Sequence, residues 1–382
     1  MKNLGLYIHI PFCKKKCNYC DFYSCTSVEK TEKYVKSICK QIIMEAPLYK
    51  EHIFDTIFIG GGTPSLIDAE SFTHLANTIK GNLRLADTLE FSIEANPGTI
   101  TSEKLAAYKK SGVNRLSIGL QSTFDNELTT LGRIHDYETF LKNYNLAREY
   151  GFDNVNIDIM YALPSQNKDA FLTTLKRVID LSPDHISAYA LKIEENTPFG
   201  KIESKLALPD EDEEYDTYLS MCDMLSKNGY LQYEISNFSK VGYECKHNLK
   251  YWKSEEYIGI GPSAHSFFSG ERYSYISNLD EYILELDEGV LPVKLLEEND
   301  ENGHSSAKIS KIDEYVMLKM RLSQGVCLEE FKALFGKNFE EVYPQMKAYL
   351  STGHVVLENG AYKFTPKGFF VSNYILTDIL SF

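Results

Sequence analysis

The stretch LYIHIPFCKKKCNYCDF, from Leu6 to Phe22, joins an apolar run to a dense group of cysteines. Leu6–Ile10 is apolar enough to predict a buried β-strand. Cys13, Cys17 and Cys20 follow it with C-x3-C-x2-C spacing, which lets three thiolates from one loop converge on one centre. Because the chain has only 8 cysteines in 382 residues, such a group indicates metal or redox chemistry and not a disulfide scaffold.

Strands and helices alternate through the first half of the chain. Apolar runs predict strands at Leu6–Ile10, Thr56–Gly60, Leu89–Ala95, Arg115–Leu120, Val155–Tyr161 and His185–Leu191. Helical patterns lie between them, at Val28–Ala46, Asp68–Lys80, Ser102–Ser111, Thr139–Tyr150 and Lys168–Asp180. Consecutive β/α units favour a parallel sheet. No G-x-G-x-x-G motif follows the first strand, so the α/β class predicted is a partial (β/α)6 barrel and not a doubly wound sheet.

The second half of the chain predicts smaller parts. We expect a barrel core over residues 1–205, a region flanking the barrel over 206–296, and a C-terminal domain over 307–382. The polar segment EENDENGHSS, Glu297–Ser306, reads as a linker, with a long surface loop as the alternative. Helical patterns and then a hairpin, His354–Phe364, turning at Asn359-Gly360, predict a small helical, winged-helix-like fold for the C-terminal domain.

Composition limits the function. Hydrophobic residues make up 43% and charged residues 25% of the chain, as expected for a protein with a buried core. The net charge of -14 disfavours a nucleic-acid partner, because binding to phosphates depends on a basic surface. No apolar run is long enough to span a membrane, and no signal peptide is evident. We therefore expect a cytoplasmic protein that is not itself a membrane protein.

The cysteine group allows more than one metal site. Cys25 could add a fourth thiolate and complete a zinc site or a fully ligated iron–sulfur cluster. Alternatively, Cys13, Cys17 and Cys20 hold a [4Fe–4S] cluster with one iron left open. The group follows the first strand, and β/α barrels carry their chemistry at the carboxyl ends of their strands. This position favours the open cluster, with Cys25 as a spare cysteine.

Polar residues also end several other strands, where a parallel barrel strand should be apolar. Gly60, Gly61 and Gly62 end the second strand in IFIGGGTPS and allow close approach of a ligand to the backbone. The remaining polar residues in or just after strands are Glu94, Gln121, Arg133 and Asp158. Each could be an ordinary capped or paired residue. Together on one rim, they favour a shared site for one polar ligand.

These motifs resemble a known superfamily. The cysteine spacing and the glycine-rich turn resemble those of the radical S-adenosylmethionine (radical SAM) superfamily. The segments LYIHIPFCKKKCNYCDF, IFIGGGTPS, EANPG, GVNRLSIGLQS, LGRIHD and HNLKYW together are similar to the coproporphyrinogen dehydrogenase-like branch, and within it to the HemW-type heme chaperones. The resemblance covers essentially the whole chain.

The resemblance implies three cofactors: a [4Fe–4S] cluster, SAM and heme. It implies that SAM binds the open iron through its amino and carboxylate groups. It also implies that SAM is contacted by a set of nine residues: Tyr7, Tyr19, Gly61, Gly62, Thr63, Glu94, Gln121, Arg133 and Asp158. From the sequence alone, Tyr7 could equally be an ordinary strand residue and Tyr19 a surface residue.

Two functions are compatible with the resemblance, and whether the chain is an enzyme stays open. One is a heme carrier; the alternative is an oxygen-independent coproporphyrinogen III dehydrogenase, which decarboxylates two propionate side chains. In the dehydrogenases a cysteine stands two residues after the third cluster ligand, and an extension precedes the first strand. Here that position is Phe22, and the first strand begins within a few residues of Met1. Both differences favour the carrier.

The segment HNLKYW, His247–Trp252, resembles the heme-binding motif proposed for these chaperones. An imidazole is a good axial ligand for heme iron, so His247 is the first candidate. His265, in GPSAHSF, and Cys245 are the alternatives, and His265 could instead line the SAM pocket. Tyr251 and Trp252 could contact a porphyrin face. The resemblance further implies transfer of heme to membrane respiratory enzymes and a homodimer when heme is bound.

Overall fold

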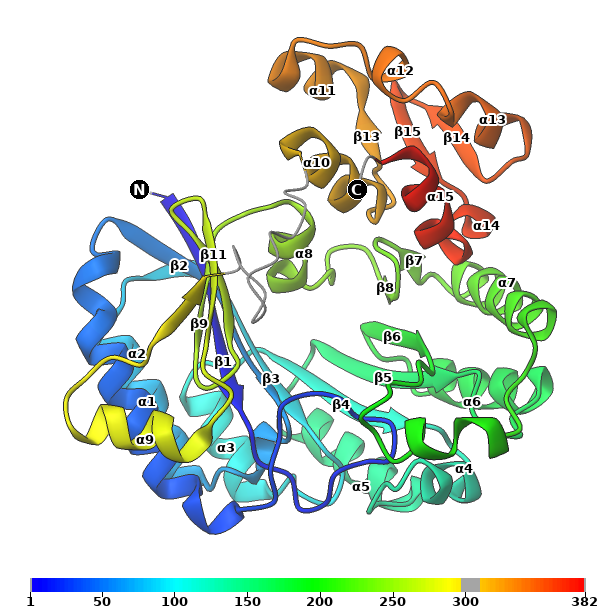
Figure 1. Ribbon diagram of the computed structural model, residues 1–382. Coiled ribbons are helices and arrows are strands. Elements are labelled where there is room, and N and C mark those ends of the chain that lie inside the picture. Colours follow the sequence, from blue (N-terminus) through cyan, green and yellow to red (C-terminus); the bar gives the residue numbers. More distant parts are fainter. Residues whose placement is uncertain (1, 297–309, 381–382) are drawn as a thin grey trace. The chain divides into compact units, whose positions relative to one another are not determined.

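The computed structural model describes residues 2–296 and 310–380, so the linker predicted at Glu297–Ser306 lies outside the described residues (Figure 1). The chain divides into two compact units. The first unit contains Met1–Asp184, Tyr189–Pro209 and Glu256–Glu297, and the second contains His185–Ala188, Asp210–Glu255 and Glu298–Phe382. The three-part domain division expected from the sequence stays a prediction.

A parallel ladder forms the centre of the first unit. Its strands are β1 (Lys2–Ile10), β2 (His52–Gly61), β3 (Leu85–Ala95), β4 (Arg115–Gln121), β5 (Val155–Tyr161) and β9 (Tyr257–Ile260), in the order β9-β1-β2-β3-β4-β5. Beyond β9 the ladder continues with antiparallel strands β10 (His265–Phe268), β11 (Glu271–Tyr275) and β12 (Lys294–Leu296). The sequence pattern did not reveal this antiparallel extension.

Helices follow the strands in sequence and cover the outer side of the ladder (Figure 1). They are α1 (Thr31–Glu45), α2 (Ala69–Asn82), α3 (Ser102–Lys110), α4 (Asp125–Thr130), α5 (Tyr137–Glu149), α6 (Lys168–Asp180) and α9 (Leu279–Asp287), with short 3-10 turns at Val28–Lys30, Ala46–Tyr49, Pro64–Leu66 and Gly200–Lys205. Asp68, Thr101, Asp136 and Asn167 cap α2, α3, α5 and α6 through their side chains. The β/α alternation confirms the predicted α/β class.

Alternation along β1 explains which side chains reach the site. Leu4, Leu6 and Ile8 are fully buried on one face of the strand, whereas Tyr7 and His9 lie on the other. β1 and β2 are parallel with Ile10 opposite Gly61, so their carboxyl ends lie at the same edge. The cysteine loop and the glycine-rich turn therefore begin side by side.

The second unit contains β6 (His185–Ala190, of which the first four residues belong to this unit), β7 (Leu231–Gln232) and β8 (Asn237–Ser239). It also contains the helices α7 (Glu211–Lys227) and α8 (Lys246–Trp252). Its C-terminal part has a three-stranded sheet in the order β13-β15-β14, formed by Val326–Cys327, Ala361–Phe364 and Val355–Glu358. The helices around it are α10 (Lys311–Met320), α11 (Leu328–Phe335), α12 (Phe339–Val342), α13 (Met346–Ser351), α14 (Pro366–Phe370) and α15 (Ser372–Ile379).

The predicted hairpin is confirmed as β14 and β15. Asn359 and Gly360 both have positive φ, 50° and 72°, which suits the two-residue turn that Asn-Gly favours. Helices followed by this hairpin confirm the predicted C-terminal fold. In the part of the chain that the structure describes, no helix has both the length and the apolar character needed to cross a lipid bilayer.

Candidate cluster and ligand site

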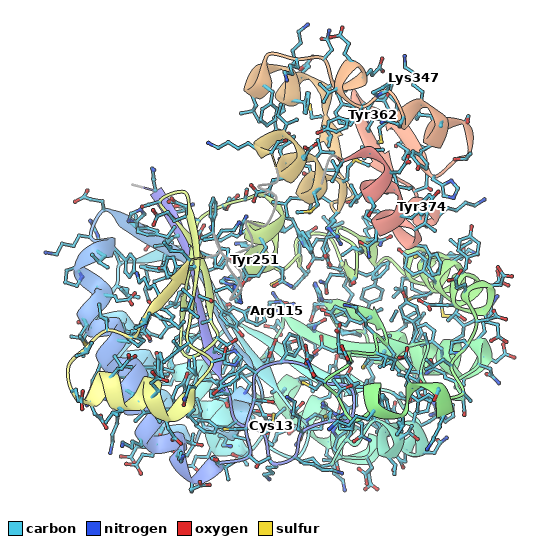
Figure 2. All side chains as sticks on the ribbon, in the orientation of Figure 1. Cys13, Arg115, Tyr251, Lys347, Tyr362 and Tyr374 are labelled. Atoms are coloured by element: carbon cyan, nitrogen blue, oxygen red, sulfur yellow. The ribbon has the colours of Figure 1, made fainter. Side chains whose placement is uncertain are left out.

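The three predicted ligand cysteines lie on the loop after β1, at the carboxyl edge of the parallel ladder. Figure 2 labels Cys13 on this loop and Arg115 at the amino end of β4. Backbone hydrogen bonds fix the loop: Cys13 N–H donates to the Cys25 carbonyl oxygen at 2.9 Å, and Cys25 N–H donates to that of Pro11 at 2.6 Å. All three thiols of the C-x3-C-x2-C motif line one cavity of about 590 Å³.

Three of the four clustered cysteines share the cavity. Cys13, Cys17 and Cys20 line it, whereas Cys25 contributes its backbone to the loop and is not part of the cavity lining. The donor set at the cavity is therefore three thiols, which fits a [4Fe–4S] cluster with one iron left open.

The surroundings of the thiols are partly apolar and partly polar. Burial raises the pKa of the Cys13 and Cys20 thiols above the ordinary cysteine value. Two groups act in the other direction on the Cys13 pKa: the Thr63 hydroxyl, which lies 3.6 Å from Cys13 Sγ, and the positive charge of Arg133. The Arg133 guanidinium also lies 3.7 Å from Cys17 Sγ. These donors would favour thiolates, the form that binds iron.

Arg133 is held in place by a second set of contacts. Its Nη2 donates to Asn96 Oδ1 at 2.6 Å and to the Gly119 carbonyl oxygen at 2.7 Å. The amide nitrogen of Asn96 in turn donates to Thr63 Oγ1 at 2.8 Å. Asn96 thus connects the residues beside Cys13 and Cys17, so the polar groups around the thiols form one network.

Two carboxylates lie at the acidic side of the cavity. Glu94, at the end of β3, accepts a hydrogen bond from Gly61 N–H at 3.1 Å. Burial, and then the nearby carboxylate of Asp158, raises the pKa of Glu94 to about 8. Asp158 accepts from Ser117 Oγ at 3.1 Å and from Asn156 Nδ2 at 2.7 Å. A cationic group entering the cavity would stabilise the ionised form of Glu94.

The glycine-rich turn closes the wall between Glu94 and the thiols. Gly61 has a φ of +116°, and a Cβ there would lie 2.7 Å from the His9 ring. A Cβ on Gly62 would lie 2.8 Å from the Phe12 carbonyl oxygen and 3.0 Å from Cys13 Sγ. Only glycine allows the cysteine loop to approach this closely.

The remaining predicted residues are placed differently. Gln121 lines the cavity with a φ of +73°, an uncommon backbone conformation for a residue other than glycine, which often marks functional sites. Tyr19 lines the cavity and packs against a buried apolar cluster that includes Leu131 and Met160. Tyr7 is not among the cavity-lining residues; its hydroxyl lies 3.0 Å from His9 Nδ1, and its ring stacks on Phe58. His9 is a buried strand residue, as predicted.

The residues of the cavity wall that sequence reasoning missed include Asn96, Ser117 and Tyr189. Asn96 stands in EANPG, where an asparagine before proline resembles an ordinary turn residue. Ser117 could have been found, because it occurs in the same strand as Gln121, on the alternation that faces the cavity. Tyr189 gives no such indication in the sequence.

The heme motif forms helix α8 in the second unit, and its histidine is inside the protein. His247 is 0% exposed, and its Nε2 lies 2.9 Å from the Tyr251 hydroxyl. Cys245 is also 0% exposed. The guanidinium of Arg321 lies 5.7 Å from the Trp252 ring, within cation–π range. His265, at the start of β10 in the first unit, is exposed.

The comparisons with known proteins agree with this geometry. Residues 7–178 match the description Radical SAM superfamily, and residues 307–371 match the description HemN C-terminal domain. The chain shares its fold with the structure entitled coproporphyrinogen III oxidase (HemN) from Escherichia coli, a radical SAM enzyme. The TM-score is 0.82, with 23% identity, covering 100% of this chain and 90% of that one. The fold and the cluster site thus define a radical SAM protein.

Similarity to curated sequences narrows the class further. The chain is 35% identical to the heme chaperone HemW of Haemophilus influenzae, over 98% of this chain and 97% of that protein. It is 33% identical to that of Bacillus subtilis, over 96% of each chain. With that of Escherichia coli it shares 40% identity over 69% of each chain. The chain belongs to the HemW family of heme chaperones.

Proposed function

We propose that this protein binds heme and transfers it to acceptor proteins, and that a SAM-bound [4Fe–4S] cluster resides in the first unit. The observation that carries the proposal is the similarity to heme chaperones along almost the entire chain, at 33–35% identity. The acceptors we propose are membrane-bound respiratory enzymes, and the heme-bound protein is proposed to form a homodimer.

The cavity residues support the cofactor part of the proposal. Cys13, Cys17 and Cys20 would ligate three irons, and their cavity leaves room for a ligand on the fourth. The cluster, when present, supplies one electron at a time and an open iron. Glu94 and Asp158 suit the amino group of SAM, whereas Arg133 suits its carboxylate. Gly61 and Gly62 keep the cavity wall free of side chains.

Phe22 favours a carrier over porphyrinogen decarboxylation. Its ring is 71% exposed and lines the cavity beside Cys20. In the dehydrogenases that this chain resembles, a cysteine stands at the position of Phe22. That cysteine would place a fourth thiol at the cavity. An exposed phenyl ring can neither transfer a proton nor donate an electron at neutral pH.

A transfer experiment tests the function. The cluster-reconstituted full chain would be loaded with about one equivalent of heme under anaerobic conditions and mixed with an apo-cytochrome from a respiratory complex. We expect the acceptor spectrum to appear faster than with free heme at the same concentration. Coproporphyrinogen III, SAM and a reductant should yield no protoporphyrinogen. Decarboxylation without heme transfer would overturn the proposal in favour of the dehydrogenase.

A further inference from the structure

An arginine from the C-terminal part of the chain lies against the helix that carries the heme motif. Within the second unit, α10 packs against α8 (Figure 1). Arg321 directly follows α10, and its guanidinium lies 5.7 Å from the centre of the Trp252 ring. Trp252 is the last residue of α8 and of the motif HNLKYW. A segment distant in sequence thus places a cation beside the heme motif.

Glu234 fixes the position of this arginine relative to the motif. The backbone of Glu234 forms an antiparallel bridge with Leu322, the residue after Arg321. The buried carboxyl of Glu234 accepts a hydrogen bond from the indole of Trp252. Glu234 therefore holds the end of α10 through its backbone and the end of α8 through its side chain. The approach of Arg321 to the motif is set by the fold.

The positive charge of Arg321 is only partly compensated. Its Nη2 donates to Asn373 Oδ1 on α15 at 3.0 Å, and this acceptor is neutral. Burial lowers the pKa of the Arg321 guanidinium, and attraction to Glu234 acts in the other direction. Glu234 is a weak counterion, because burial raises its pKa to about 7 and leaves it about half ionised at neutral pH. A further carboxylate beside Arg321 would stabilise the guanidinium.

Heme supplies such a carboxylate at a suitable place. His247 and Trp252 are five residues apart on α8, which corresponds to about 7.5 Å along the helix at 1.5 Å per residue. The propionates lie at one edge of the porphyrin, so iron near His247 leaves that edge within reach of the end of α8 where Arg321 lies. The side chains of Trp252 and Arg321 are both half-buried, so each presents part of its surface to a ligand.

We propose that Arg321 binds a propionate of the heme held at α8, so that the C-terminal part of the chain takes part in heme recognition. This inference rests on the proposed heme-carrier function and adds a recognition residue to it. The contact is an ion pair with two parallel N–H donors, and no covalent bond changes. A porphyrin whose propionates are esterified lacks this contact, so the protein should discriminate between heme and its dimethyl ester.

The test is a titration of the full cluster-reconstituted chain with ferric heme and with ferric heme dimethyl ester, followed by absorbance. The measured quantity is the ratio of the two affinities. The wild type should bind heme about tenfold more tightly than the ester, a difference of roughly 1.4 kcal/mol. Arg321→Ala should weaken heme binding about tenfold and leave the affinity for the ester unchanged. Arg321→Lys retains the charge and should retain part of the preference.

A matched control and the wild type itself keep the inference open to refutation. Arg84→Ala, at an exposed arginine of the first unit, should keep the wild-type ratio. If the wild type binds both porphyrins equally, or if Arg321→Ala loses affinity for both by the same factor, Arg321 does not recognise a propionate and the inference is overturned, although the carrier function stands. If the wild type binds neither porphyrin saturably, the proposed function itself fails.

Discussion

Replacing Glu94 by glutamine should stabilise the cofactor-free protein relative to the wild type, and this difference should grow as the pH rises. The Glu94 carboxyl faces the cavity, where burial and the Asp158 carboxylate raise its pKa from 4.5 to about 8. In the unfolded chain the same group ionises near its ordinary value. The folded state therefore holds the proton more tightly, and its contribution to stability is complete below pH 4.5 and is lost as the pH rises towards 8.

The magnitude follows from the two pKa values. Each pH unit between them costs the folded state about 1.4 kcal/mol, which gives roughly 3 kcal/mol at pH 7 as an upper figure. Part of the Glu94 side chain is exposed to the cavity, so we expect about 2 kcal/mol after solvent screening. Glutamine cannot ionise, yet its side-chain oxygen can still accept the hydrogen bond from Gly61 N–H.

The assay is urea unfolding of both proteins, free of iron and in reductant, from pH 5 to pH 8.5. Circular dichroism would follow the whole chain, whereas fluorescence of Trp252 reports on the second unit alone. The difference in unfolding free energy between Glu94→Gln and the wild type should grow through pH 5 to 8 and then level off. Glu149→Gln, at an exposed position on α5, should show no such growth. A difference independent of pH would refute the reasoning, since Glu94 would then be ionised in the folded protein.

Three further changes test other parts of the molecule. Cys17→Ser should lose iron and sulfide while keeping the far-ultraviolet circular dichroism of the wild type; full iron and sulfide content would contradict the ligand assignment. Gly61→Ala should destabilise the first unit by about 1–3 kcal/mol in urea unfolding, because its φ is +116° and the new Cβ would lie 2.7 Å from His9; an unchanged midpoint would count against this close approach. Burial raises the pKa of Glu234, which accepts a hydrogen bond from Trp252, to about 7. Trp252 fluorescence should therefore titrate near pH 7, and Glu234→Gln should abolish the transition; persistence in the variant would assign it to another group.

The parts of the site that could be predicted from sequence are those with local patterns. Val155–Tyr161 and Lys168–Asp180 have the predicted bounds, because apolar alternation and an Asn167 cap are local features. The cysteine spacing after an apolar run predicted the thiol-lined cavity. Polar residues in apolar strands predicted Glu94, Gln121 and Asp158, which all line it.

The parts that could not be predicted depend on contacts distant in sequence. The pairing of His265 with Ser274 and of Ser274 with Leu295 combines weakly apolar segments whose partners are not evident from either strand alone. The burial of His247 is likewise set by tertiary packing of α8, because a seven-residue helix has no strong apolar periodicity. Sequence similarity pointed to the motif, whereas only the structure shows that its imidazole is enclosed.

The antiparallel extension is joined directly to the strand that carries the cysteines. The cysteine loop continues from β1, β1 pairs with β9, and Tyr7 lies opposite Gly259 in that ladder. A Cβ on Gly259 would lie 2.3 Å from the His265 carbonyl oxygen, so β9 and the start of β10 are in close backbone contact. Two hydrogen-bonded ladders therefore connect β1 to β10 within the first unit, whereas His247 belongs to the other unit. None of these pairings could be read from a local pattern, because each joins segments more than two hundred residues apart or strands too short to show alternation.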